Sequence, residues 1–269
     1  MGMLLSAGLL FVQSAVAQVS DSLSVLSCNH SFRAVQLAAP GVLVAAGATG
    51  LFAPVREWKV DVRDQVREYT LDRTFADEYV QYVPAAMAVV GDWIGAEAQH
   101  GFLDRLLLLG TSYVVMAVTV NGIKYTVTSP RPSIYDEVYL SNNPRDLNPK
   151  NNPKSFNSFP SGHTSTAFMG AELVRLEYGA DSPWMAVAAY AVATGTGIMR
   201  VWNEQHWFTD VLAGAGMGIL GARIGWWMLP WVSNVADRVL GLDATHGQKL
   251  TVAPVGTAGQ LGCAMCLSF

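Results

Sequence analysis

Residues 199–229 read MRVWNEQHWFTDVLAGAGMGILGARIGWWML, and this stretch joins a polar cluster to a long apolar run. The cluster holds Arg200, His206 and Asp210, and the apolar run starts inside it at Phe208. Glycine recurs along the run at positions 214, 216, 218, 221 and 225. Small residues at such spacing let membrane helices approach one another closely. The stretch therefore predicts a tightly packed membrane helix over residues 208–229 that begins in a polar site.

The composition of the whole chain also indicates a membrane protein. Of its 269 residues, 51% are hydrophobic and only 14% are charged, and its mean hydropathy is +0.26. Soluble domains carry roughly 25% charged residues. The net charge of −4 provides no basic surface for a nucleic acid partner. We therefore expect one compact integral membrane protein with sizeable polar loops.

Five further apolar segments precede the one at 208–229. The first, 34–54, is nearly uncharged and about long enough to cross ~30 Å of hydrocarbon. Several of the others are shorter than ~20 residues, which favours tilted or partly embedded helices. These others cover residues 79–95, 103–123, 159–176 and 184–199. The expected fold is all-α, a polytopic membrane helical bundle.

The regions outside these segments divide the chain further. Residues 3–17 are apolar and end in Ala-Val-Ala, which is typical of a secretory signal cleaved after Ala17; an uncleaved anchor is the alternative. Residues 55–78 mix acidic, basic and apolar side chains, which fits an amphipathic helix on the membrane surface or a solvated connector. Alternation and a glycine turn in the tail predict a short β-hairpin. The expected parts are a signal peptide at 1–17, an N-terminal segment at 18–78, a core at 79–243 and a tail at 244–269.

The three cysteines, Cys28, Cys263 and Cys266, give little support for a metal site. The Cys-x-x-Cys pair near the C-terminus has no second pair and no neighbouring histidine, so zinc ligation is not indicated. A disulfide or unreactive thiols are the simpler interpretations.

Two further polar clusters lie at the ends of apolar segments. The first, KYTVTSPRP at 124–132, follows the segment at 103–123. The second, PSGH at 160–163, opens the segment at 159–176. In an up-and-down bundle these ends, and those beside the third cluster, lie on one side of the membrane. The topology alone therefore brings the three clusters together near the interface, where charged side chains are tolerated.

Together the clusters can handle a phosphate without a metal. His206 and Asp210 are four residues apart, so in a helix they share a face, and the carboxylate can hold one ring nitrogen while the other attacks phosphorus. His163 is placed to protonate the leaving oxygen. Ser161 is a natural helix N-cap, and Gly162 lets backbone N–H groups approach an anion.

Three cations complete the set. Lys124, Arg131 and Arg200 can surround the phosphoryl oxygens and stabilise the charge of a trigonal-bipyramidal transition state. Each feature alone has an ordinary explanation, because a snorkelling cation, a helix start or a capping His–Asp pair has the same sequence. Their ordered combination favours the catalytic interpretation.

The ordered pattern Lys-x6-Arg-Pro, Pro-Ser-Gly-His and Arg-x5-His-x3-Asp resembles the signature of the type 2 phosphatidic acid phosphatase (PAP2) superfamily, over roughly residues 79–230. The resemblance implies a six-helix core and a metal-independent phosphatase, without a cofactor, that forms a covalent phosphohistidine. It implies that His206 is the nucleophile, Asp210 its orienting partner and His163 the general acid and base. It assigns phosphate binding to the remaining residues, Lys124, Arg131, Ser161, Gly162 and Arg200. The family usually has serine where this chain has Met199, so one hydroxyl is missing.

Within that family the chain resembles the bacterial membrane-bound lipid phosphatases. This implies an amphiphilic phosphorylated lipid as substrate and the bilayer as its surroundings. Phosphatidic acid, phosphatidylglycerol phosphate, undecaprenyl diphosphate and lipid A phosphates are the candidates, and the motifs do not choose among them. Two other hypotheses are an enzyme resembling the vanadium haloperoxidases and a non-catalytic lipid-binding membrane protein. The apolar segments disfavour the first, and the intact charged positions disfavour the second.

The resemblance also implies a site on the periplasmic face of the bacterial inner membrane. A cleaved signal followed by six full spans would instead place the clusters on the cytoplasmic side. An uncleaved N-terminal anchor would reconcile the two expectations, and so would a weak segment, 34–54 or 79–95, that does not span.

Overall fold

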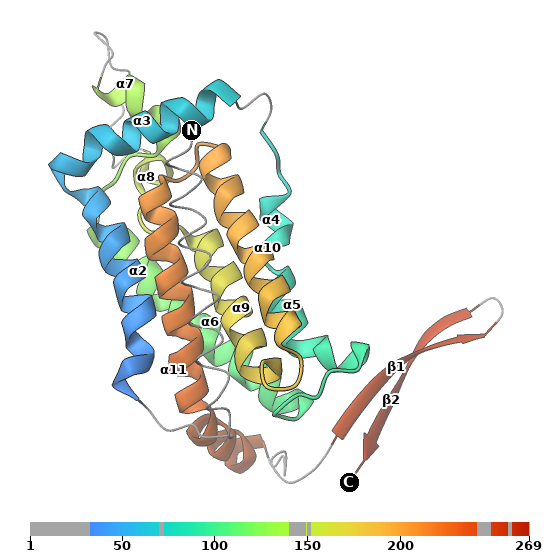
Figure 1. The fold of residues 1–269 in the computed structure, drawn as a ribbon. Helices are drawn as coiled ribbons and strands as arrows, with labels where there is room; N and C mark the ends of the chain where they lie inside the picture. The colour runs from blue at the N-terminus through green and yellow to red at the C-terminus, as the bar shows by residue number, and fades with distance from the viewer. Residues whose placement is uncertain are drawn as a thin grey trace.

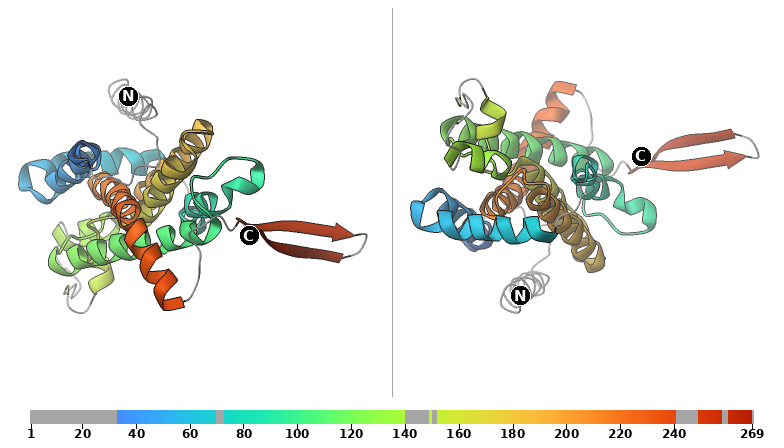
Figure 2. Two further views of the ribbon diagram at one scale, coloured as in Figure 1. Left: turned by 90° about the horizontal axis from the view of Figure 1, so that it is seen from below. Right: turned by 90° about the horizontal axis from the view of Figure 1, so that it is seen from above.

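The computed structural model describes residues 33–69, 73–139, 149, 152–240, 249–257 and 260–268. The expected signal peptide at 1–17 and Cys28 therefore lie outside the described residues. Within them the chain forms a bundle of roughly parallel and antiparallel helices, with one helix lying across an end and a hairpin outside it (Figures 1 and 2).

Helices form in each of the six expected apolar segments, so the all-α prediction is confirmed. Short 3₁₀-helices lie next to several of these helices. They are η2 (Ala34–Leu37), η3 (Thr49–Leu51), η4 (Gly91–Ile94) and η5 (Pro132–Ile134). The α-helices are α2 (Ala38–Ala48), α3 (Ala53–Tyr69), α4 (Asp77–Val80), α5 (Val83–Val90), α6 (Phe102–Thr126), α7 (Tyr135–Tyr139), α8 (Pro153–Phe156), α9 (Gly162–Tyr178), α10 (Pro183–Trp202) and α11 (Phe208–Leu240).

Helix α9 is the centre of the bundle. It packs against α5, α6, α10 and α11, and α11 in turn packs against α2 and α6. The α9 side chains Ala167, Met169 and Val174 are fully buried, whereas a two-sided surface helix would expose one face. Since α9 begins with the second cluster, the most enclosed helix of the bundle also positions part of the polar site.

Helix α11 packs closely against α9, as its glycines predicted. A Cβ atom added to Gly214 would lie 2.5 Å from the carbonyl oxygen of Ser161, the residue that precedes α9. One added to Gly218 would also overlap the Ser165 carbonyl oxygen on α9. Real Cβ atoms do not approach backbone oxygens this closely, so only glycine allows α11 to lie against α9 at this separation. The spacing of these glycines therefore sets the distance between the second and third clusters.

Three helical stretches among the described residues are long and apolar enough to cross a membrane: Ala34–Leu51, Phe102–Thr126 and Phe208–Val239. They indicate an integral membrane protein. Helix α5, by contrast, has only eight residues, which agrees with the expectation that 79–95 is a weak segment.

The predicted helix within 55–78 is present as α3, but its charged side contacts protein. Figure 1 shows α3 lying across one end of the bundle. Lys59 and Arg63 are buried there, and the ring of Trp58 packs edge-on against Phe208 at 4.5 Å between centroids. Charged residues on this helix therefore hold it onto the bundle, and the residues to Tyr69 are not a solvated connector.

The tail forms the predicted β-hairpin. Strand β1 (Lys249–Thr257) pairs antiparallel with β2 (Gln260–Ser268), with Lys249 opposite Ser268 and Thr257 opposite Gln260. The hairpin extends away from the helices in every view (Figures 1 and 2). It is remote from the end of the bundle that holds the polar clusters.

Candidate active site

The three polar clusters meet at the end of the bundle that α3 covers. Lys124 lies in the last turn of α6, and Arg200 lies in the last turn of α10. Ser161 is the N-cap of α9, and Asp210 lies in the first turn of α11. The up-and-down topology thus brings these helix ends together, as the segment order predicted.

Backbone hydrogen bonds join the first cluster to the second. The N–H of Ser129 donates to the Phe156 carbonyl oxygen at 2.8 Å, and the N–H of Ser158 donates back to Ser129 at 3.0 Å. Beside this pairing, the Lys124 ammonium donates to the carbonyl oxygen of Asn157 at 2.8 Å. The two ends of the long polar loop are therefore fixed against each other.

The third cluster is attached to both of the others. The N–H of Ser161 donates to the Asp210 carbonyl oxygen at 3.0 Å, and Arg131 donates to the Gln205 side chain at 2.5 Å. Burial, together with the nearby charge of Arg200, lowers the pKa of Arg131 from its ordinary value. A guanidinium remains charged despite such a shift, so these arginines form a cationic site that attracts an anion.

The buried imidazole of His206 is held by a backbone carbonyl. Its Nδ1 lies 2.6 Å from the Ser158 carbonyl oxygen, which can only accept, so Nδ1 must carry the proton and donate. The other nitrogen, Nε2, then keeps its lone pair. Asp210 was expected to make this contact, but its carboxylate lies 3.7 Å from Nδ1. The sequence reasoning missed Ser158, because a carbonyl that orients a ring has no side-chain signature.

Asp210 helps to hold the His206 ring indirectly, through Ser158. Its Oδ2 accepts from the Ser158 hydroxyl at 2.5 Å and from the Trp207 N–H at 3.0 Å. The carboxylate therefore fixes the residue that holds His206 and also caps the start of α11, where a negative charge is favourable.

Burial keeps the His206 ring neutral at physiological pH. It lowers the pKa of His206 to about 4, and the positive charges of Lys124 and Arg131 act in the same direction against the attraction of Asp210. A neutral imidazole with a free Nε2 is the form that can attack phosphorus.

His163 and Arg200 both have an atom without a hydrogen-bond partner. These are the Nε2 atom of His163 and the Nε atom of Arg200, and both are buried. The opposite side of the Arg200 guanidinium is fixed, because one of its Nη atoms donates to Asp77, and Asp77 also accepts from Asn203 at 2.9 Å. A buried polar atom without a hydrogen-bond partner is costly, so both atoms are available to hydrogen-bond a bound ligand.

Ser161 in the second cluster occupies the N-cap position as expected, but its hydroxyl does not cap the helix. Ser161 occupies the N-cap position of α9 with extended backbone, but its hydroxyl pairs with the Thr164 hydroxyl at 2.9 Å and not with a backbone N–H. Gly162 has open space where a Cβ would project. The room for an anion at this helix start is therefore beside Gly162, while Ser161 is buried.

The turn that holds His206 is fastened from outside by arginines. Glu204 adopts a left-handed backbone with φ of 53°, which is unfavourable for a residue with a side chain. Its carboxylate accepts from Arg67 at 2.5 Å and from Arg73 at 3.1 Å, and its carbonyl accepts from the Ser133 N–H at 3.2 Å. These contacts stabilise the strained turn and connect α3 to the site.

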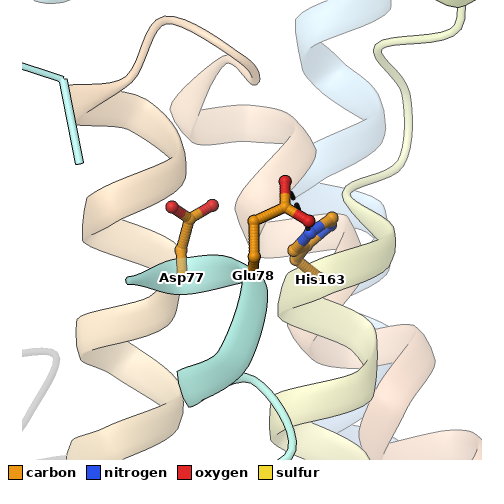
Figure 3. A group of neighbouring side chains, drawn as sticks. All are labelled: Asp77, Glu78 and His163. Atoms are coloured by element: carbon orange, nitrogen blue, oxygen red, sulfur yellow. Dashed lines mark ion pairs between the residues drawn. The ribbon is translucent and has the colours of Figure 1, made fainter. Parts of the chain in front are cut away.

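Two carboxylates that the sequence analysis did not assign also lie beside His163. Figure 3 shows Asp77 and Glu78, from α4, with Glu78 pointing at the imidazole. Glu78 Oε1 lies 3.8 Å from His163 Nε2, and ligand atoms of all three residues lie within 4.8 Å of one another. Both Asp77 oxygens are already engaged, by Arg200 and Asn203, so the group is poorly suited to hold a metal ion.

The chain is similar to known proteins over the region that holds this site. A family model described as the PAP2 superfamily matches residues 105–234. The lipid A 1-phosphatase of Porphyromonas gingivalis is 46% identical over 101 residues, which cover 38% of this chain and 21% of that protein. The bacitracin transport permease protein BcrC of Bacillus licheniformis is 29% identical over 177 residues, which cover 65% of this chain and 80% of that protein.

A solved structure is also similar, that of the first transmembrane PAP2 type phosphatidylglycerolphosphate phosphatase from Bacillus subtilis, with 18% identity and a TM-score of 0.44 over 75% of this chain and 97% of that one. The chain spans about a fifth of the length of the Porphyromonas protein. The family match includes all three polar clusters, from Lys124 to Asp210. The part of the chain that forms the candidate site therefore matches the PAP2 superfamily.

Proposed function

We propose that this protein is a membrane phosphatase that hydrolyses a phosphorylated lipid through a phosphohistidine intermediate and without a metal ion. The observation that carries the proposal is the buried His206, whose Nδ1 is held by the Ser158 carbonyl oxygen at 2.6 Å. Its Nε2 is thereby left as a neutral nucleophile, and the cations Lys124, Arg131 and Arg200 supply the charge that a phosphoryl group requires.

The first step transfers the phosphoryl group to the enzyme. His206 Nε2 forms a bond to phosphorus as the bond from phosphorus to the leaving oxygen breaks. The leaving oxygen takes a proton from His163, which supplies it as general acid. The cations stabilise the negative charge on the three equatorial oxygens.

The second step reverses the proton transfer. His163, now neutral, takes a proton from a water molecule, and the water oxygen bonds to phosphorus as the bond to His206 Nε2 breaks. Inorganic phosphate leaves, and both histidines return to their starting states. Asp210 acts through Ser158, since its carboxylate accepts from the Ser158 hydroxyl.

A lipid is the substrate class that best suits the surroundings of the site. Lys124 and Asp210 lie at the ends of two helices that are long and apolar enough to cross a membrane, so an amphiphile could present its phosphate there without leaving the bilayer. Relatives are named lipid A 1-phosphatase and, in Arabidopsis thaliana, probable lipid phosphate phosphatase 4, which is 26% identical over 187 residues. Phosphatidic acid, phosphatidylglycerol phosphate, undecaprenyl diphosphate and lipid A phosphates are the candidates.

The site is proposed to face the periplasm from the inner membrane. This orientation is the one that the family resemblance implies. Helix α2 runs from the opposite end of the bundle toward α3, which covers the clusters (Figure 1), so a periplasmic site requires the start of this helix to lie on the cytoplasmic side.

Phosphate release by the purified protein in detergent tests the proposal. Each candidate lipid is offered to the wild type, to His206→Ala and to Glu97→Gln, a control that removes an exposed charge far from the clusters. We expect release from at least one lipid by the wild type and the control, and none by His206→Ala. Equal release by His206→Ala would contradict the nucleophile, and no release from any lipid would contradict the function.

Two inhibitors test the chemistry of the same reaction. Orthovanadate mimics the trigonal-bipyramidal transition state, so it should inhibit, whereas EDTA should leave the rate unchanged. Loss of activity in EDTA that added divalent cations restore would contradict the metal-free mechanism.

A further inference from the structure

The charges around the site are distributed unevenly. On the side of His206 lie the cations Lys124 and Arg131, whose charges act on the His206 ring. On the side of His163 lie two carboxylates, Asp77 and Glu78 (Figure 3). In the proposed reaction the phosphoryl group bonds to His206, while His163 faces the leaving group. The leaving group therefore departs toward the carboxylates.

The two carboxylates differ in how far their charge is neutralised. Asp77 is buried, bonded to the Arg200 guanidinium and to Asn203. Glu78 is 57% exposed at its side chain, and His163 is its ion-pair partner among the described residues, at 3.8 Å. When His163 gives its proton to the leaving oxygen, that partner becomes neutral. Glu78 then has no charged ion-pair partner among the described residues while it lies beside the leaving group.

We propose that Glu78 is a specificity residue that disfavours anionic leaving groups, so that this protein hydrolyses lipid phosphate monoesters in preference to lipid diphosphates. The inference rests on the proposed function, and it narrows the substrate class of the same site. A monoester releases a neutral alcohol once His163 has protonated it, and no repulsion arises. A diphosphate releases a lipid phosphate, whose negative charge would lie beside the Glu78 carboxylate.

The proton of His163 also favours the monoester. An alkoxide is a much poorer leaving group than a phosphate, so the monoester depends more strongly on the proton. A leaving lipid phosphate stays negatively charged even after it has taken the proton. Burial and the charge of Arg200 disfavour the protonated imidazole, whereas Glu78 and, to a smaller extent, Asp77 favour it. The carboxylate therefore assists most the reaction that depends most on a general acid, and it repels the leaving group that remains an anion.

Farnesyl phosphate and farnesyl diphosphate provide a matched pair of substrates, because they share a tail and differ only in the leaving group. The ratio of kcat/KM for the two is measured for the wild type, Glu78→Gln, Glu78→Lys and the control Glu97→Gln. The assays contain EDTA, because a magnesium ion bound to the diphosphate would screen its charge. His206→Ala confirms that release occurs at this site.

We expect the wild type and Glu97→Gln to favour the monophosphate. Glu78→Gln should shift the ratio toward the diphosphate by about tenfold, and Glu78→Lys should shift it further, because the added charge attracts the leaving phosphate. A change that only damaged the fold would lower both activities together.

The outcomes separate the two proposals. If the wild type prefers the diphosphate, or if both Glu78 variants leave the ratio unchanged while phosphate is still released, the role of Glu78 is wrong and the phosphatase function stands. If the wild type hydrolyses neither farnesyl substrate nor any lipid of the panel, both proposals are wrong.

Discussion

The contact between His206 Nδ1 and the Ser158 carbonyl oxygen decides which ring nitrogen keeps its lone pair. Because the carbonyl only accepts, the proton is fixed on Nδ1 and the lone pair on Nε2. Asp210 does not hold the ring directly, since its carboxylate lies 3.7 Å away. The two residues therefore have separable effects on the reaction.

Replacing Asp210 should cost less activity than replacing His206. In Asp210→Ala the Ser158 hydroxyl and the Trp207 N–H lose their acceptor, but the Ser158 carbonyl still holds the ring. Hydrogen bonds to a charged group contribute about 1.5–3 kcal/mol, which corresponds to a rate loss of roughly 10- to 150-fold. The steady-state turnover rates of Asp210→Ala and His206→Ala measure the difference. Complete loss of activity in Asp210→Ala would contradict it, because the carboxylate would then be as essential as His206.

The pKa of His206 predicts how stability changes with pH. Burial lowers the pKa to about 4, below the ordinary value of 6.5, so the unfolded chain binds a proton between these values that the folded protein does not. The folded state should therefore lose stability as pH falls from 6.5 toward 4, by up to about 3 kcal/mol. Thermal unfolding in detergent over this range should fall more steeply for the wild type than for His206→Gln; parallel curves would contradict the shift.

Residue spacing predicted which side chains form the site, but not every contact among them. Lys124, His163 and Arg200 lie at helix ends, and Arg131 and His206 lie in the connections beside them, so all five are found at one end of the bundle. The Ser158 carbonyl could not be predicted, because every residue has one. Asp77 and Glu78 were missed because they lie in a stretch that pattern alone assigned to a surface helix or connector, more than eighty residues before His163.

At the scale of elements, the packing of α11 against α9 sets the geometry of the site. The Ser161 carbonyl oxygen occupies the space where a Cβ of Gly214 would lie, at 2.5 Å. Ser161 also donates its N–H to Asp210, so any displacement here moves the second cluster relative to the third.

Gly214→Ala should therefore reduce both stability and turnover. Overpacking of this kind typically costs about 1–3 kcal/mol. Gly195→Ala on α10 is the matched control, because a Cβ there meets nothing within 4 Å and the change should be neutral or slightly stabilising. Thermal unfolding and phosphate release measure both variants; equal behaviour would show that α9 and α11 can separate without cost.

The sequence pattern predicted that α3 is a helix but not what it contacts. The alternation of charges predicted a helix, and α3 is one. The pattern could not say that Lys59 and Arg63 are buried against the bundle or that Arg67 binds Glu204. Those contacts depend on partners far along the chain, and periodicity carries no information about them.

The whole molecule is a bundle with its polar clusters at one end and a loop with an exposed Glu97 at the other. Six apolar segments and an up-and-down order were sufficient to predict that arrangement. A buried ionic group within the bundle was not anticipated: Glu172 accepts from Arg175 at 2.8 Å and from Arg223 at 2.7 Å. These three residues lie inside segments that were identified by their mostly apolar composition, and a few charged residues do not change that average.

Cysteine labelling tests which side of the membrane the clusters face. In a chain without Cys28, Cys263 and Cys266, a single cysteine replaces either Glu57, exposed on α3, or Glu97, exposed at the opposite end. With the outer membrane permeabilised, a maleimide that cannot cross the inner membrane should label the Glu57→Cys protein only. Labelling of Glu97→Cys alone would place the clusters in the cytoplasm.

In the proposed reaction, His206 becomes covalently phosphorylated during turnover. A lipid substrate that supports release is mixed with the wild type and with His206→Ala, the reaction is quenched under alkaline denaturing conditions that preserve phosphohistidine, and the peptides are analysed by mass spectrometry. We expect one added phosphoryl group on the wild-type peptide that contains His206, and none on any peptide of His206→Ala. A phosphoryl group on another residue, or steady release by His206→Ala, would contradict this account.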